Sequence, residues 1–114
     1  MKAIKITTNN EVSMFNVLQP TYKALQKVVG GYIEIVHPKG LPHPFCLVVN
    51  EEGLLNKKPI NKYGSFLYGY QEHRQPIVGD IVIMKEVETE DGRDLGGLSD
   101  AEIRELGVIL MEVE

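Results

Sequence analysis

The strongest constraint on the fold is an unbroken apolar segment, Phe45-Cys46-Leu47-Val48-Val49. A half-buried strand alternates apolar and polar side chains, whereas an unbroken apolar run is typical of a strand that is covered on both faces. We therefore expect residues 45–49 to form a central strand of a β-sheet.

The segment after this strand, from Asn50 to Ser65, stays polar over 16 residues. Most connections between strands in small domains need about two to five residues before apolar periodicity returns. We interpret Asn50 to Gly53 as the turn by which the central strand leaves the sheet. The remainder is longer than a turn requires, which indicates a built loop and makes this segment the first place to look for a functional site.

Helical spacing, alternation and turn residues predict the other elements. A helix is expected from about Pro20 to Val29, ended by Gly30-Gly31, and the Ser99/Glu102 capping box predicts a short helix that ends at Gly107. The stretch 63–70 fits either a strand or irregular structure, and 108–113 could continue as a last strand. The remaining predicted strands and turns are a hairpin of 2–8 and 11–17, a strand 32–36, a strand within 77–84, and a turn at Asp91-Gly92.

These elements predict one α+β domain over residues 1–114, with a mainly antiparallel sheet and one or two helices packed on it. A chain of 114 residues buries roughly two-thirds of its unfolded surface, so it folds without a disulfide or a metal. Its one cysteine, Cys46, lies inside the apolar run, and we expect it to be a buried structural thiol.

The net charge of −4 bears on the choice of partner. Nucleic-acid binding usually needs a basic surface that neutralises phosphates, and the longest basic run here is Lys57-Lys58, so we expect no nucleic-acid partner. The N-terminus lacks the apolar core of a signal peptide, and no apolar run approaches the length of a membrane span. We therefore expect a cytoplasmic protein without a membrane partner.

Residues that could hold a metal do not form a recognisable set. His37 and His43 lie six positions apart in a Pro-rich loop, and no second pair of His or Cys completes a zinc site. A site that adds Glu51 or Glu52 is a weaker alternative. The acidic stretch 86–94 fails the pattern of a calcium loop at both ends, so we interpret it as a solvated hairpin tip. We expect neither a metal nor a cofactor.

The sequence contains no nucleophile elbow, phosphate-binding loop, dinucleotide motif or catalytic-triad spacing. Glu51 and Glu52 are neighbours, so on an extended chain they point to opposite faces and do not act as an acid–base pair. We therefore assign no catalytic residue. One enzymatic alternative stays open, in which Glu52 works with Asp80 or His73 after folding.

Aromatic residues gather just after the polar loop. Tyr63, Phe66, Tyr68 and Tyr70 lie within eight residues, close to Asn61. Tyrosines with amides commonly line planar ligands and protein interfaces, although the simpler interpretation is that about half of them pack the core.

Four segments, in this order, carry a family resemblance: Gly30 to Glu34, Val48 to Leu54, Lys58 to Asn61, and Ile77 to Val82. Their order resembles a family of small uncharacterised bacterial and phage proteins that is known only as a domain of unknown function. The resemblance covers about residues 20 to 107 and implies an accessory protein of phages, plasmids or conjugative elements, without implying catalytic residues. Lys57-Lys58-Pro59 departs from the pattern, which favours a small apolar residue before the proline, and 108–113 fits it loosely.

The leading hypothesis is a non-enzymatic protein that binds a host protein or a small ligand, nucleotide-like or otherwise, through residues 50–70. The alternatives are a small hydrolase or lyase acting on a nucleotide or related anion with the help of a divalent cation, and a structural protein that forms homo-oligomers. The candidate binding residues are Asn50, Glu52, Asn61, Tyr63, Tyr68, His73 and Asp80.

Overall fold

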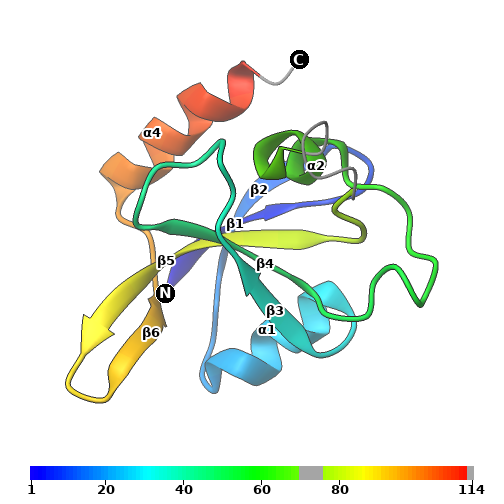
Figure 1. Cartoon of the computed structure of the whole chain (residues 1–114). Coiled ribbons are helices and arrows are strands. Elements are labelled where there is room, and N and C mark those ends of the chain that lie inside the picture. Colours follow the sequence, from blue (N-terminus) through cyan, green and yellow to red (C-terminus); the bar gives the residue numbers. More distant parts are fainter. Residues whose placement is uncertain (70–75, 113–114) are drawn as a thin grey trace.

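A computed structural model, which describes residues 1–69 and 76–112, places the predicted central strand inside one antiparallel sheet. The order of strands is β2-β1-β5-β4-β3, and β6 pairs with the second half of the long strand β5 (Figure 1). The strands are β1 Lys2–Ile6, β2 Val12–Asn16, β3 Ile33–Val36, β4 Phe45–Asn50, β5 Ile81–Thr89 and β6 Gly92–Gly96.

The strand β4 is buried over its whole length, as its unbroken apolar sequence predicts. Phe45, Leu47 and Val49 face one apolar cluster, and Cys46 and Val48 face a second cluster on the other side of the sheet. Because successive strand residues point to opposite faces, both faces of the sheet have to be covered.

Helices cover both faces. The helix α1, Thr21–Val29, packs on the side of Cys46 and Val48, whereas α2, Lys62–Tyr68, and α4, Asp100–Met111, pack on the opposite side (Figure 1). The α+β prediction is confirmed, with three helices in the described part of the chain instead of one or two. No described helix combines the length and the apolar character needed to cross a bilayer.

The expectation that 63–70 forms a strand or irregular structure is wrong, because 63–68 lie in α2 and Gly69 is the C-cap of this helix. The side chain of Asn61 accepts a hydrogen bond from Gly64 N at 2.9 Å and caps the first turn of the helix. Tyr63 and Leu67, one helical turn apart, then reach the core together.

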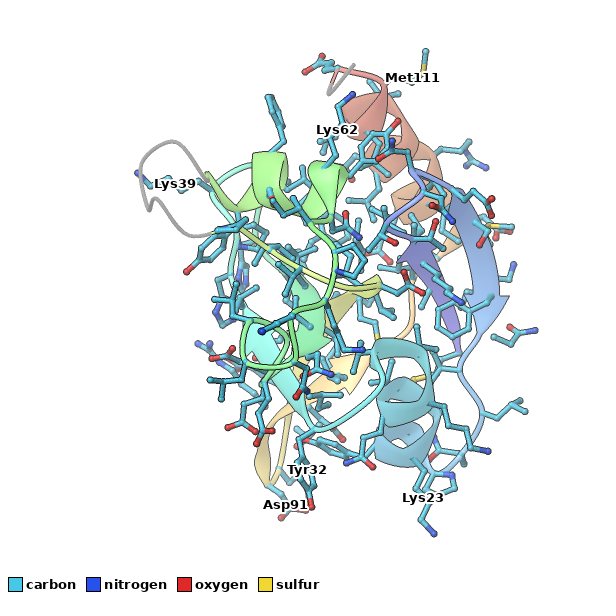
Figure 2. All side chains as sticks on the ribbon, turned by 90° about the vertical axis from the view of Figure 1, so that its right-hand side faces the viewer. Lys23, Tyr32, Lys39, Lys62, Asp91 and Met111 are labelled. Atoms are coloured by element: carbon cyan, nitrogen blue, oxygen red, sulfur yellow. The ribbon has the colours of Figure 1, made fainter. Side chains whose placement is uncertain are left out.

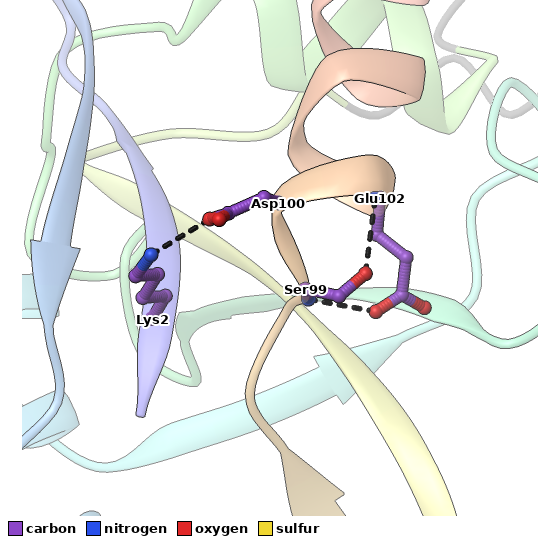
Figure 3. Close-up of polar contacts among 4 residues, drawn as sticks. All are labelled: Lys2, Ser99, Asp100 and Glu102. Carbon is purple, nitrogen blue, oxygen red and sulfur yellow. Dashed lines mark hydrogen bonds and ion pairs between the residues drawn. The ribbon is translucent and has the colours of Figure 1, made fainter.

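The last predicted strand is also wrong, since α4 continues through Gly107 to Met111. Leu106 and Leu110 are buried on the same side of the helix, and their packing outweighs the poor helix propensity of Gly107. The predicted capping box is present: Ser99 Oγ accepts from Glu102 N at 3.1 Å, and the Glu102 carboxylate accepts from Ser99 N at 2.8 Å (Figure 3). Lys2 pairs with Asp100 beside it.

Several smaller predictions are confirmed. The opening hairpin, the helix stop at Gly30 and the turn at Gly92 are all formed. Helical spacing places Leu18, Tyr22, Leu25, Val28 and Val29 on one apolar stripe of the first helix. The buried part of this stripe is narrower, because Leu18 and Tyr22 are exposed while Leu25 and Val29 are buried.

Candidate functional site

A cavity of about 410 Å³ opens where β4 leaves the sheet, next to the edge strand β3. We call it the acidic cavity; its walls are Glu34 and Val36 of β3, residues 49–55, Tyr68 at the end of α2, and residues 76–78. Its volume lies within the range of small-molecule sites in proteins. Glu34, Glu51 and Glu52 contribute three carboxylates, and no Lys, Arg or His is among the described lining residues.

The turn that forms the rim of the acidic cavity is held by its own backbone. Lys58 N donates to Gly53 O at 3.1 Å, and Asn56 N donates to Glu52 O at 2.9 Å. Gly53 is required at the base of the turn, because a Cβ there would lie 2.7 Å from Val78 Cγ2. Leu54 and Leu55 are left exposed at the rim. The polar run is thus a compact structure that presents two carboxylates and two leucines.

Asn50 lines the cavity, but its amide already has partners in the fold. Its Nδ2 donates to Val29 O at 3.0 Å, and its Oδ1 accepts from Glu52 N at 2.7 Å. These bonds join the end of α1 to the turn after β4. Asn50 therefore positions the rim more than it offers hydrogen bonds to a ligand.

Asn61 is farther from the solvent. Its side chain is fully buried, and besides capping α2 it donates to Ile6 O at 3.0 Å and to Gly79 O at 2.9 Å. Both amide protons are used within the protein. The expectation that Asn61 offers hydrogen bonds to a partner is therefore replaced by a structural role.

The predicted aromatic residues separate into two environments. Tyr63 is 9% exposed and belongs to the core on the α2 and α4 side of the sheet, whereas Tyr68 is half-buried and lines the acidic cavity. Tyr68 also packs against the core cluster, and Phe66 is 59% exposed. Tyr70 lies outside the described residues, so the expectation that about half of the aromatic cluster packs the core stays a prediction. His73 lies outside the described residues.

Asp80 lies in a different, smaller cavity of about 150 Å³, so it does not meet Glu52 in the acidic cavity. Its Oδ1 accepts from Thr8 N at 3.1 Å, which ties the turn of the opening hairpin to the start of β5. Among the candidate residues that the structure describes, only Asn50, Glu52 and Tyr68 line the acidic cavity.

Sequence reasoning missed Glu34 as a member of the site. Its place in an Ile-Glu-Ile-Val strand signals only that one side chain faces outward. Its position opposite Val49 in the β3–β4 register brings it to the acidic cavity, and that register cannot be read from local periodicity.

His37, His43 and Cys46 are not among the described lining residues of the acidic cavity. His37 contacts the carboxylate of Glu86, a residue of β5 that lies before the exposed hairpin tip. No group of three His, Cys, Asp or Glu side chains in residues 1–69 and 76–112 is arranged to hold a metal. Burial raises the pKa of the Cys46 thiol to about 12, which keeps it protonated and unreactive.

The sequence profile of a family described as a domain of unknown function, DUF3846, matches residues 1–108. The chain belongs to this family. The match confirms the resemblance found in the sequence and extends it to the opening hairpin, which lies before the predicted start at residue 20. No curated protein and no solved structure matches the chain.

In this DUF3846 chain, the structure explains the lysine that departs from the family pattern. The alkyl chain of Lys58 crosses Gly79, where a Cβ would lie 3.0 Å from Lys58 Cδ. Its ammonium group reaches Gly30 at the C-terminal end of α1, where the helix dipole favours a positive charge. Lys58 therefore connects the polar loop to the C-terminal end of α1.

Proposed function

We propose that this chain is a small, non-enzymatic accessory protein of a phage or other mobile element that binds a host protein or a small ligand in the host cytoplasm. The binding site is the acidic cavity, within the 50–70 region and the neighbouring strand β3. The observation that carries the proposal is this cavity of about 410 Å³, which combines three carboxylates with the exposed side chains of Leu54 and Leu55. The mobile-element setting rests on the family resemblance.

The charge of the cavity favours a cationic occupant over the nucleotide-like ligand that the sequence suggested. A phosphate that entered would approach Glu34, Glu51 and Glu52, and like charges at a binding site oppose association. An occupant with a Lys or Arg side chain would instead gain charge-assisted hydrogen bonds from the same carboxylates. The exposed leucines provide apolar contact beside them.

The test is a titration followed by NMR of the backbone amides. The probes are a short Lys/Val peptide, its Glu/Val counterpart, and ATP with Mg²⁺. We expect the basic peptide alone to shift residues 34 and 50–55, and the double substitution Glu51→Gln/Glu52→Gln to weaken it about fivefold, since each exposed ion pair contributes up to about 1 kcal/mol. A matched control, Glu90→Gln/Asp91→Asn at the exposed hairpin tip, should leave binding unchanged. Equal weakening by both pairs, or tighter binding of ATP at the cavity, would contradict the proposal.

The hydrolase or lyase alternative has less support. Glu52 and Asp80 line different cavities. Turnover of nucleotides or phosphodiesters with Mg²⁺ or Mn²⁺ by the parent, and its loss in Glu52→Gln, would revive this alternative.

A second candidate function, homo-oligomerisation, is favoured by one observation at the opposite edge of the sheet. The strand β2 carries no charged residue, and Val12 and Met14 are 43% and 59% exposed. Such an edge pairs readily with another strand. Sedimentation of the parent and of Met14→Lys over a range of concentrations tests this candidate: a dimer that the lysine abolishes supports it, and a parent that stays monomeric contradicts it.

A further inference from the structure

The strand β3 forms an edge of the sheet, and its backbone groups alternate between β4 and the outside (Figure 2, where cyan β3 and blue β2 lie at opposite edges). The bond from Glu51 N to Tyr32 O marks Tyr32 and Glu51 as a hydrogen-bonded pair. In an antiparallel ladder these pairs alternate with non-bonded ones. Glu34 and Val36 therefore bond to β4, and the N–H and C=O groups of Ile33 and Ile35 point away from the sheet.

In residues 1–69 and 76–112, neither a proline nor a bulge interrupts this edge. Natural sheets protect an edge with proline, a bulge, charges, a covering segment or a short strand, whereas the four residues of β3 read Ile-Glu-Ile-Val and hold an unbroken register with β4. Its only charged side chain, Glu34, points into the acidic cavity. The open backbone groups and the cavity thus lie side by side on one strand.

We infer that the partner is an extended, basic peptide segment that adds to the sheet as a strand along β3. This inference rests on the proposed function of the acidic cavity and names the chemistry of its occupant. The backbone of the segment would pair with Ile33 and Ile35, which is the mode of recognition called β-augmentation. Side chains of the added strand opposite Glu34 and Val36 would lie on the cavity face, because directly opposed residues in a sheet share a face.

The charges near the β3 edge favour a basic peptide segment as the occupant. A Lys or Arg opposite Glu34 would also lie toward the rim carboxylates of Glu51 and Glu52, which line the same cavity. At the other edge, the groove between β2 and α1 carries Lys23 and Lys27 instead. A basic segment is therefore attracted to the β3 edge and disfavoured beside β2, which fixes both the edge and the sign of the partner.

One substitution separates pairing with the edge from attraction by the carboxylates. Ile35→Pro removes an N–H that points outward and leaves the β3–β4 hydrogen bonds in place, since proline is tolerated at outward positions of edge strands. Ile35→Ala is the matched control, because it loses a similar amount of side chain and keeps the N–H. We expect the Lys/Val peptide to bind Ile35→Pro about tenfold more weakly than Ile35→Ala, because one hydrogen bond is lost and a carbonyl of the peptide is left without a donor.

A second measurement uses the parent protein alone. The probes are two Lys/Val peptides that are N-methylated at alternate residues, one at the odd and one at the even positions. Methylation removes the N–H donors from one edge of the extended peptide, so one of the two peptides offers β3 an edge without donors and the other offers an intact edge. The peptide with the intact edge should bind as the unmodified peptide does and the other should fail. If both peptides bind equally and Ile35→Pro matches Ile35→Ala while Glu51→Gln/Glu52→Gln binds weakly, strand addition is overturned and the cavity remains the binding site.

Two other outcomes overturn the inference. If the Lys/Val peptide does not bind the parent, the proposed function fails together with strand addition. If the parent sediments as a dimer that Ile35→Pro dissociates, a second copy of this chain occupies the edge in place of a basic peptide.

Discussion

The replacement of Asn61 by alanine tests the role that the structure gives this buried side chain. The amide joins three parts of the chain, since it caps α2 through Gly64 N and donates to the carbonyl oxygens of Ile6 and Gly79. Loss of the cap costs about 1 kcal/mol. Two carbonyl groups that lose a buried donor cost about 1–3 kcal/mol each. We expect the free energy of unfolding to fall by about 3–7 kcal/mol, a large part of the roughly 5–15 kcal/mol typical of a domain.

Urea unfolding followed by circular dichroism at 222 nm measures this change, because the chain has no tryptophan to report by fluorescence. Asn56→Ala is the matched control, since Asn56 is an exposed asparagine in the neighbouring turn and its replacement should alter stability by less than about 0.5 kcal/mol. Asn61→Asp separates the two functions of the amide, because it keeps the capping oxygen and loses both donors. It should be at least as destabilised as Asn61→Ala at pH 7. A loss below about 1 kcal/mol in Asn61→Ala would refute the reasoning.

Three further predictions follow from local geometry. Gly107→Ala should raise the free energy of unfolding by up to about 1 kcal/mol, because nothing lies within 4 Å of its added Cβ, whereas Gly64→Ala should lower it, because its Cβ would lie 2.7 Å from Ile81 Cδ1; urea titration of both variants gives the two signs. Cys46 should resist iodoacetamide at pH 8 in the native protein and react once urea unfolds it, because its pKa is about 12. Donation from Lys85 and Ser99 holds the pKa of Glu102 below its ordinary value of 4.5, so its contribution to stability is present above that pH and is lost as the pH falls through the lower folded value. The fall in stability between pH 6 and pH 3 should therefore be smaller in Glu102→Gln.

The elements that the sequence predicts well are those set by local chemistry. Three patterns each determine an element within a few residues: the alternation in the opening hairpin, the unbroken apolar run of β4, and the capping box at Ser99. The helix α2 was missed for the opposite reason. Its aromatic residues favour a strand and Gly64 disfavours a helix, while the contacts that settle the matter come from Ile77 and Ile81, which are distant in sequence.

The residues of the candidate site also fall into two groups, those that local sequence identifies and those placed by contacts distant in sequence. Glu52 and Tyr68 lie in the acidic cavity because they belong to the polar loop and its aromatic continuation, which the sequence marks out. Asn61 was a candidate because it lies next to the aromatic cluster, and tyrosines with amides commonly line ligands and interfaces. Its burial depends on the carbonyl of Ile6, 55 positions away, and no local pattern reports such an acceptor. Glu34 enters the site through the strand register, which is likewise nonlocal.

The contacts of Asn61 also determine how binding data on this chain must be interpreted. Asn61 N donates to Ile77 O at 2.8 Å, and Ser65 Oγ donates to Ile77 O and accepts from Ile77 N. The start of α2 therefore holds the 76–78 wall of the acidic cavity. A variant of Asn61 that binds a partner weakly could therefore have lost the wall without ever touching the partner. Glu52 makes no side-chain contact of this kind among the described residues, and it is exposed at the rim. We expect Glu52→Gln to bind the partner weakly and to keep the free energy of unfolding of the parent, as a residue that contacts the partner would. We expect Asn61→Ala to bind weakly and to lose stability, as a residue that shapes the cavity would.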